Sequence, residues 1–386
     1  MHHMPTRRAF LARAGALGCS AAASPVLTPI AMANAPGENR LVVIILRGAL
    51  DGLDALRPIG DPAFKALRPK LSDGGTPLGD GFFALHPDLA GLAPLWDSGE
   101  LAFVPATSTP YRDKRSHFDG QDLLEAGSAD DAGSVRDGWL NRMLTLLPGV
   151  SARTAFALGR TRMRILEGPA PMTHWSPGTT LELGPQAQLL LEYLYGQDPL
   201  FAEAGHTALE MGLAEDVAPQ GGRAGEVLAR YLAQQLRDET RIASLSLSGF
   251  DTHQWQKNRL RPALRNLQAT LLTLRAELGP IWARTTVLAI TEFGRTAREN
   301  GTGGTDHGTG GAAILAGGAL KGGRMLGGWP GLAESALYAG RDLMPLRDVR
   351  AYAAWAMRDM YGLRASDLAR TVFPGLEMGD NPGLLL

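Results

Sequence analysis

The chain has 386 residues, of which 45% are hydrophobic and 20% are charged, a balance that permits a sizeable core and excludes a disordered chain. Its formal net charge is −1, and no basic stretch of the kind that contacts phosphates is found, so we expect no nucleic-acid partner. The 48 glycines and 25 prolines indicate many irregular connections rather than a helical bundle.

Residues 1–33 resemble a twin-arginine export signal. Arg7 and Arg8, followed by Phe10 and Leu11, precede an apolar stretch of small residues. This resemblance implies recognition by the twin-arginine translocation machinery, cleavage after Ala33, and a periplasmic or secreted protein with no stable membrane span in its mature form. An ordinary secretory signal or an uncleaved anchor is the alternative.

The mature chain, residues 34–386, is expected to form a single domain. Residues 1–33 hold three arginines and no acid, so the remainder has 35 basic and 39 acidic residues and a net charge of −4. The only cysteine, Cys19, lies in the signal segment, so we expect neither a disulfide nor thiol chemistry in the mature protein.

Six short apolar runs have the composition of buried strands. They cover residues 41–46, 101–104, 154–158, 242–247, 285–290 and 311–316. Stretches with helical spacing lie between and after them, at residues 89–98, from about 119, at 139–147, between 185 and 243 with the clearest piece at 224–244, and at 255–278, 346–361 and 365–371. Residues 57–81, 167–185 and 317–331 are expected to be loops. Strands that alternate with helices predict a doubly wound α/β fold, with a mainly parallel sheet and helices on both faces.

Polar side chains follow these strands where each one ends. In a parallel sheet, ligands collect beyond the carboxyl ends of the strands. The residues expected at that edge are Asp51, Ser116, His117, Asp251, His253, Glu292 and Arg295, together with Asp306 and His307 on a glycine-rich loop. We therefore expect a functional site at this edge.

Carboxylates and imidazoles are typical ligands of divalent metal ions. The expected ligands of a zinc, manganese or calcium ion are Asp51, Asp251, His253, Glu292, Asp306 and His307. Asp251 and His253 have a spacing that lets both side chains turn toward one ion from a non-helical turn. The alternative for His307 is a hydrogen bond to a carbonyl of its glycine-rich loop.

Ser116, His117 and Arg295 are the expected catalytic residues. Ser116 lies near the start of a helix, where backbone N–H groups favour an anion. The forked guanidinium of Arg295 suits a tetrahedral oxyanion. The alternatives are that Ser116 only caps the helix, that the basic residues before it form a solvated turn, and that Arg295 pairs with Glu292.

Five motifs in succession resemble those of the exported domain of unknown function 1501 family. They are Arg47-Gly48-Ala49-Leu50-Asp51-Gly52-Leu53, Ser116-His117-Phe118-Asp119, Gly249-Phe250-Asp251-Thr252-His253, Thr291-Glu292-Phe293-Gly294-Arg295-Thr296 and Thr305-Asp306-His307-Gly308. That family is similar in fold to the alkaline phosphatase and sulfatase superfamily. The resemblance implies a nucleophile at a helix start, facing one or two metal ions held by Asp and His residues from strand ends.

The resemblance carries over to individual positions. Asp51 matches the acid after the first strand, the Ser116 region matches the nucleophile, and Asp251, His253 and His307 match metal ligands. Where the superfamily usually has an Asp-His pair after the fifth strand, this chain has Glu292-Phe293, and the spacing from Asp251 to His253 is shorter than usual. These departures favour a single-metal, altered or inactive site over a two-metal site.

These features predict an exported metal-dependent hydrolase of sulfate or phosphate esters. Its substrate is expected to be a small-molecule or saccharide ester, attacked by a hydroxyl nucleophile. The alternative is a non-catalytic exported binding protein of the same fold that holds an anionic or carbohydrate ligand.

Overall fold

The computed structural model describes residues 37–129, 135–151, 154–158, 163–175 and 223–386, all within the unit Asn34–Leu386. The other unit, Met1–Ala33, lies outside the described residues, as does most of the helical pattern expected between residues 185 and 243. The export signal therefore stays a prediction. Within the described part of the chain, no helix is long and apolar enough to cross a membrane.

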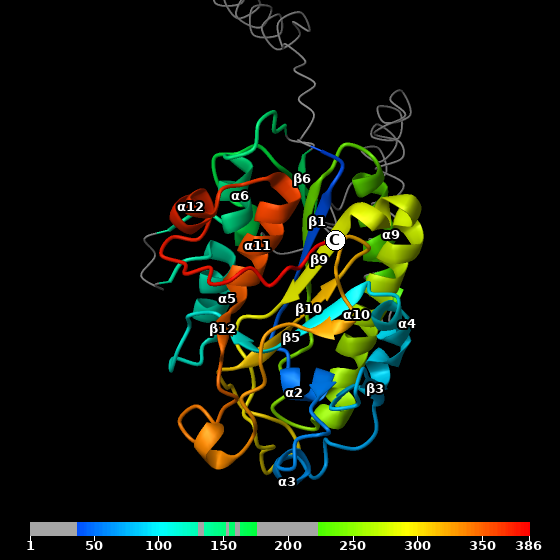
Figure 1. Ribbon diagram of the computed structural model, residues 1–386, viewed down its shortest axis with the longest axis vertical. Helices are drawn as coiled ribbons and strands as arrows, with labels where there is room; N and C mark the ends of the chain where they lie inside the picture. Colours follow the sequence, from blue (N-terminus) through cyan, green and yellow to red (C-terminus); the bar gives the residue numbers. More distant parts are fainter. Residues whose placement is uncertain (1–36, 130–134, 152–153, 159–162, 176–222) are drawn as a thin grey trace, which may run out of the picture. The chain divides into compact units, whose positions relative to one another are not determined.

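A nine-stranded sheet is the largest element of the described residues (Figure 1). Its strands are β1 (Arg40–Leu46), β5 (Leu101–Ser108), β6 (Ala155–Leu158), β7 (Thr173–Trp175), β8 (Ile242–Leu247), β9 (Thr285–Ile290), β10 (Gly311–Ala316), β11 (Arg324–Met325) and β12 (Arg347–Asp348). The order is β11-β5-β10-β9-β1-β8-β6-β7, and β12 also pairs with β5. Every pairing is parallel except those of β10. The expected mainly parallel sheet is confirmed.

The central strand β1 is buried on both faces, as its unbroken apolar run predicts. Successive side chains of a strand point to opposite faces. One set therefore enters the core on one side of the sheet, namely Val42, Ile44 and Leu46. The other set enters the core on the opposite side, namely Leu41, Val43 and Ile45.

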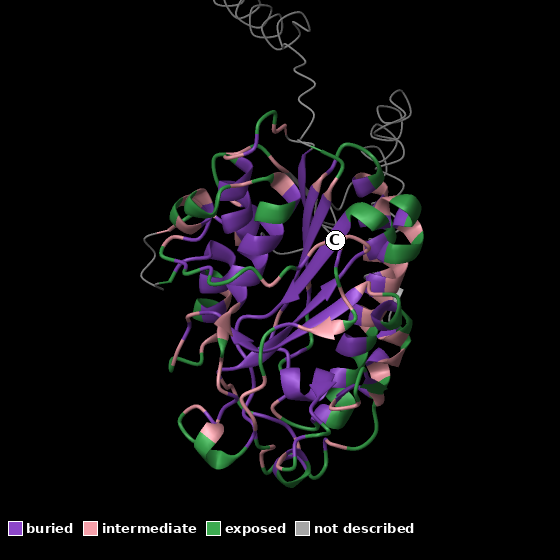
Figure 2. Cartoon of the chain, viewed as in Figure 1, coloured by how far each residue is buried: buried purple, intermediate pink, exposed green. Residues whose placement is uncertain are grey.

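Helices cover both faces, which confirms the doubly wound arrangement (Figures 1 and 2). The core that contains Val42 is covered by α9 (Arg223–Arg237), α10 (Gln256–Leu278), the 3-10 helix Pro87–Leu92 and α4 (Ala93–Asp97). The core that contains Val43 is covered by α5 (His117–Ala126), α6 (Trp139–Leu144), α11 (Val349–Tyr361) and the π-helical turn Leu368–Val372, which follows α12 (Ala365–Asp367).

Short elements occupy stretches that were expected to be loops. A small antiparallel sheet joins β2 (Leu56–Arg57), β4 (Phe83–Leu85) and β3 (Thr76–Leu78), with α3 (Phe64–Leu67) between its strands. The strands β7 and β11 also lie in expected loops. Segments of two to four residues are too short to show a hydrophobic period, so the sequence does not predict them.

The reversed strand β10 matters most for the site. Because β10 runs antiparallel to β9, it starts at the edge where β9 ends, so the connection between them begins and ends at the carboxyl edge of the sheet. The chain approaches itself closely there. A Cβ added at Gly294 would lie 1.8 Å from the carbonyl oxygen of Gly310, so this approach requires glycine.

Candidate metal centre

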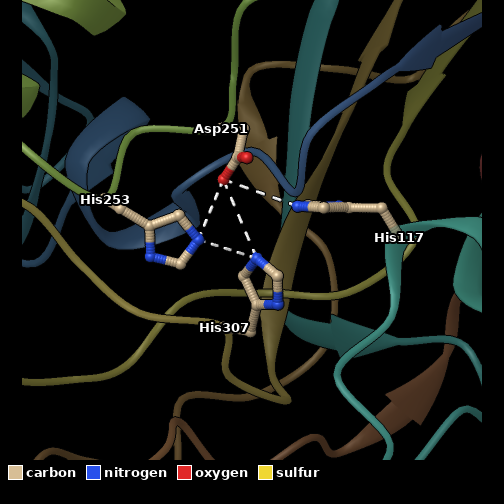
Figure 3. Close-up of side chains that lie close together, drawn as sticks. All are labelled: His117, Asp251, His253 and His307. Atoms are coloured by element: carbon tan, nitrogen blue, oxygen red, sulfur yellow. Dashed lines mark hydrogen bonds and ion pairs between the residues drawn. The ribbon is translucent and has the colours of Figure 1, made fainter.

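Four side chains converge at the carboxyl edge of the sheet: His117, Asp251, His253 and His307 (Figure 3). Each offers one ligand atom, and the four atoms lie within 4.8 Å of one another. Asp251 Oδ1 lies 3.4 Å from His117 Nε2, 3.1 Å from His253 Nε2 and 3.7 Å from His307 Nε2, and the Nε2 atoms of His253 and His307 are 2.9 Å apart. A tetrahedral ion with bonds of about 2.0–2.1 Å holds its ligand atoms about 3.3–3.4 Å apart. The measured distances bracket that spacing, so the cluster fits one ion.

The four residues come from three separate segments. His117 is the first residue of α5, Asp251 and His253 follow β8, and His307 lies on the loop that enters β10. The sequence singled out three of them as ligands and His117 as catalytic, and the structure brings all four together. Among the described residues, His117 Nε2 is buried without a hydrogen-bond partner, and an orphaned ring nitrogen aimed at other ligand atoms fits a metal ligand.

Glu292 is not one of the four clustered residues but lies behind His117. Its Oε1 is 2.8 Å from His117 Nδ1 and accepts hydrogen bonds from the backbone of Gly48 and Ala49 and from Gln121. Burial raises the pKa of Glu292, but the hydrogen bonds from His117 and its other donors outweigh burial and lower that pKa. The same bond raises the pKa of His117. Glu292, which was expected to be a ligand, is therefore placed to orient His117 and is not one of the four clustered residues.

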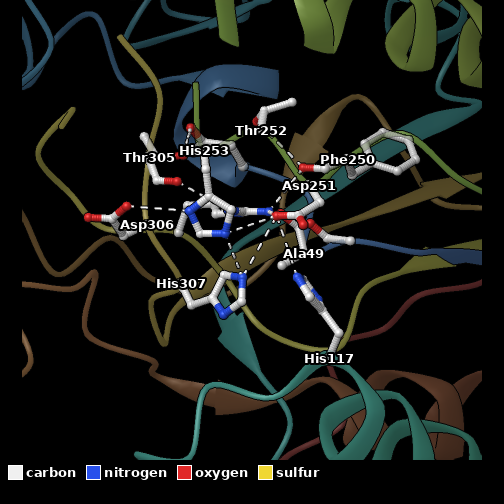
Figure 4. A network of polar contacts seen from close by, with 12 residues as sticks. Ala49, His117, Phe250, Asp251, Thr252, His253, Thr305, Asp306 and His307 are labelled. Atoms are coloured by element: carbon white, nitrogen blue, oxygen red, sulfur yellow. Dashed lines mark hydrogen bonds and ion pairs between the residues drawn. The ribbon is translucent and has the colours of Figure 1, made fainter. Parts of the chain in front are cut away.

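The other two histidines are oriented in the same way. His253 Nδ1 lies 3.4 Å from Asp306 Oδ1 (Figure 4). His307 Nδ1 lies 2.8 Å from the carbonyl oxygen of Arg115. Metal-binding histidines typically donate their second ring nitrogen to a carboxylate or carbonyl, which leaves Nε2 free for the ion. Burial lowers the pKa of His307 to about 4, so its ring is neutral at pH 7. Asp306 is therefore a supporting residue rather than a ligand.

Arg295 is not placed to face a substrate. It is buried, and its guanidinium donates to backbone carbonyls from three loops, those of Gly48, Ala49, Phe250 and Thr305. It also donates to Asp251 Oδ1 at 2.6 Å. Burial raises the pKa of Asp251, but the hydrogen bond and charge of Arg295 outweigh burial and lower that pKa. Arg295 therefore links the three loops through hydrogen bonds and stabilises the ionised form of Asp251.

Asp51 is likewise not placed as a ligand. Its carboxylate is buried and accepts from Arg68 Nη1 at 2.5 Å, from Gln256 Nε2 at 2.6 Å and from the backbone of Leu53. It caps the short helix α2 (Gly52–Ala55). A carboxylate that neutralises a fully buried arginine has a structural role, which the sequence did not reveal because Arg68 lies in an expected loop.

Gln256 connects the buried pair of Asp51 and Arg68 to the two loops that carry Asp251, His253 and His307. Its Oε1 accepts from Thr252 Oγ1 at 2.9 Å and from Thr305 Oγ1 at 2.7 Å, while its Nε2 donates to Asp51 and Asp54. Thr252 lies between two of the clustered residues, and Thr305 lies two residues before a third. One buried amide thus joins both loops, a role that no motif in the sequence indicated.

The model of a family described as "Protein of unknown function (DUF1501)" matches residues 200–350, which contain three of the four clustered residues. The expected resemblance to that family is confirmed. Among curated protein sequences, none matches the chain.

The chain is also similar to several solved structures. The C-terminal periplasmic domain of EcEptC from Escherichia coli is 8% identical over 90% of this chain and 92% of that chain, with a TM-score of 0.44. The PsFucS1 sulfatase from Pseudoalteromonas sp. is 12% identical over 90% of this chain and 73% of that chain, with a TM-score of 0.40.

Ser116 caps helix α5, which was one of the two roles expected for it. Its Oγ accepts from the backbone of Asp119 at 3.4 Å, and its own N–H donates to the hydroxyl of Tyr111 at 2.7 Å. Ser116 is partly exposed and directly precedes His117. The nearby hydroxyls of Thr107 and Ser108, by contrast, are buried and donate to backbone carbonyls.

Proposed function

We propose that this protein is a metal-dependent hydrolase of phosphate or sulfate esters that holds one Zn²⁺ ion. The observation that carries the proposal is the convergence of three imidazole Nε2 atoms and one carboxylate oxygen, each imidazole oriented through its Nδ1. Imidazole suits zinc, whereas calcium prefers oxygen ligands. The side chains of Asp251 and His253 are 48% and 41% exposed, so a substrate can reach the cluster.

The residues of the site have separate tasks. The four clustered residues hold the ion, Glu292 orients His117 through its Nδ1, and Arg295 holds Asp251. A bound divalent ion supplies a Lewis acid that polarises the ester and stabilises developing negative charge.

Basic groups beside the cluster favour an anionic substrate. The turn of residues 112–115 holds three basic residues and one acid, and the hydrogen bond between His307 and Arg115 places it against the cluster. The positive end of the α5 dipole follows directly. Asp113 and Arg115 adopt left-handed backbone conformations, with φ of 63° and 55°, and strain of this kind concentrates at functional sites.

Ser116 is the proposed nucleophile, because it is partly exposed and adjacent in sequence to the ligand His117. Its Oγ attacks phosphorus or sulfur, and the alcohol of the ester leaves with the proton that the hydroxyl loses. Water then cleaves the bond between the serine and the phosphoryl or sulfuryl group, which restores the hydroxyl and releases phosphate or sulfate.

Hydrolysis of 4-nitrophenyl phosphate and 4-nitrophenyl sulfate by the zinc-loaded protein tests this function. Wild-type protein is expected to hydrolyse one of them, and a chelator is expected to stop the reaction. Ser116→Ala and Ser116→Asn should each lower kcat more than about 10³-fold. Asparagine can still cap the helix, so the second variant separates lost chemistry from the roughly 0.5–2 kcal/mol that a lost cap costs.

Ser98→Ala is the matched control, because Ser98 is exposed and lies just before β5, at the opposite edge of the sheet. Activity that survives in Ser116→Asn would assign the nucleophile elsewhere. A wild-type protein that binds phosphate or sulfate yet cleaves no ester would instead make this a binding protein.

We infer that the protein is exported by the twin-arginine route, on the sequence pattern around Arg7 and Arg8. Changing both arginines to lysine is expected to leave the precursor in the cytoplasm, which cell fractionation and immunoblotting would measure. Arg13→Lys, which leaves the pair intact, is the control. Unchanged export of the double variant would remove this inference without touching the proposed chemistry.

A further inference from the structure

Two exposed aromatic residues are close in sequence to the clustered residues. Among the described residues, the exposed large hydrophobic side chains are Ile59, Phe118, Trp255, Leu346 and Leu386. Only two of these five are aromatic, and both neighbour the cluster in sequence. Phe118, 87% exposed, follows His117, and Trp255, 66% exposed, is two residues beyond His253. Leaving such a ring in water forgoes the stabilisation that burial would give, so two exposed rings at these positions require an explanation.

The two rings belong to segments that reach the cluster from opposite sides. In Figure 3, His117 and His253 approach Asp251 from opposite directions. His117 brings with it the first turn of α5, which carries Phe118, and His253 precedes the start of α10, where Trp255 lies. The polar ligands lie between these segments, so the two rings do not form one continuous apolar patch of the kind that a protein partner or a membrane covers.

The backbone holds Trp255 in a strained position. Its φ is 55°, in the left-handed region that is unfavourable for a residue other than glycine. Its N–H donates to Thr302, and the next N–H donates to Gly303, so the glycine-rich loop fixes this conformation. The side chain makes no capping hydrogen bond to α10. An exposed tryptophan that is held in a strained conformation two residues from His253 indicates a binding role.

We propose that Phe118 and Trp255 bind the alcohol part of the ester, and that this part carries a flat, weakly polar ring. An aryl group and the CH face of a sugar ring share that surface, and either packs against an aromatic side chain. This proposal rests on the proposed function, because the ester group has to lie at the metal cluster for the alcohol part to lie between the two segments.

Binding measured without turnover tests the proposal separately from catalysis. Phosphonates, which are not hydrolysed, are used with the wild-type protein, and phosphate esters are used with the Ser116→Ala protein. Calorimetry on the zinc-loaded protein would compare phenylphosphonate with methylphosphonate, and glucose 1-phosphate with ethyl phosphate. The protein is expected to prefer the ring-bearing member of at least one pair, and the preferred pair identifies the ring as aryl or sugar. Phe118→Ala and Trp255→Ala should each raise the Kd of the preferred ligand about 2 to 10-fold, while the Kd of the ligand without a ring stays unchanged.

Two further variants sharpen the comparison. Trp255→Phe keeps a ring and should retain most of the preference. Leu386→Ala removes a side chain that is 89% exposed and lies at the opposite edge, where its N–H donates to Ala319 beyond the end of β10, so it should change nothing. Equal Kd values within both ligand pairs, or a preference that survives both alanine variants, would overturn the proposal. A ring preference without any hydrolysis would retain the ring-binding role of Phe118 and Trp255 and overturn the proposed function.

Discussion

Replacing His117 with alanine is expected to lower the affinity of the protein for Zn²⁺ by more than about 100-fold. The reason is that the ion loses one of four ligands, whereas loss of a residue that only supports a ligand typically costs about 10 to 100-fold. A titration of the metal-free protein against a competing chromophoric chelator measures the Kd. Asp251→Ala, His253→Ala and His307→Ala are expected to behave alike, because the four ligand atoms lie within 4.8 Å of one another.

Glu292→Gln provides the graded comparison. It keeps the length of the side chain and one carbonyl oxygen but removes the charge that faces His117 Nδ1, so its Zn²⁺ affinity should fall only about 10 to 100-fold. Thermal unfolding in a chelator shows whether each variant still folds. A His117→Ala protein with wild-type affinity and a full complement of zinc would rule out the cluster, and so would a wild-type protein that takes up no zinc.

The strands could be predicted from the sequence because full burial leaves a simple pattern. The expected bounds of β8, β9 and β10 agree with the structure, and α10 begins one residue later than expected. Neither the direction of β10 nor the order of the strands was predictable, since both depend on pairing between distant segments. The direction of β10 brings the loop that holds His307 back to the carboxyl edge, so the convergence of the four side chains depends on a topology that no local pattern shows.

The sequence places the candidate site at the carboxyl edge of the sheet, but it does not indicate which partner each side chain contacts. All nine expected residues follow strand ends or lie on the loop that returns there, so backbone topology alone brings them to one edge. Whether a carboxylate binds the ion or supports a ligand depends on where its side chain points. Glu292 contacts Nδ1 of His117, and Asp306 contacts Nδ1 of His253. Asp51 contacts Arg68. Those partners come from remote or loop segments, which periodicity and spacing do not reveal.

A carboxylate at this edge of the sheet can either bind the ion or form a structural ion pair, and the buried pair of Asp51 and Arg68 allows the two roles to be separated. Arg68 is fully buried and its Nη1 lies 2.5 Å from Asp51 Oδ2. Asp51→Ala leaves that guanidinium without its counter-charge, and breaking a buried pair from one side costs about 3–5 kcal/mol. The free energy of unfolding of the metal-free protein, measured in urea, should fall by this amount.

Asp73→Ala is the matched control, because Asp73 is exposed and its only ion pair among the described residues is a 4.0 Å contact with the exposed Lys257. Its loss should change the free energy of unfolding by less than about 0.5 kcal/mol. If Asp51 were instead a metal ligand, Asp51→Ala would leave the metal-free protein nearly as stable as the wild type and weaken Zn²⁺ binding as strongly as His117→Ala does. Two measurements on Asp51→Ala therefore decide between the roles: the free energy of unfolding of the metal-free protein and the Kd for Zn²⁺ of the folded protein. A structural ion pair changes the free energy of unfolding even when no ion is bound, whereas a metal ligand mainly changes the Kd.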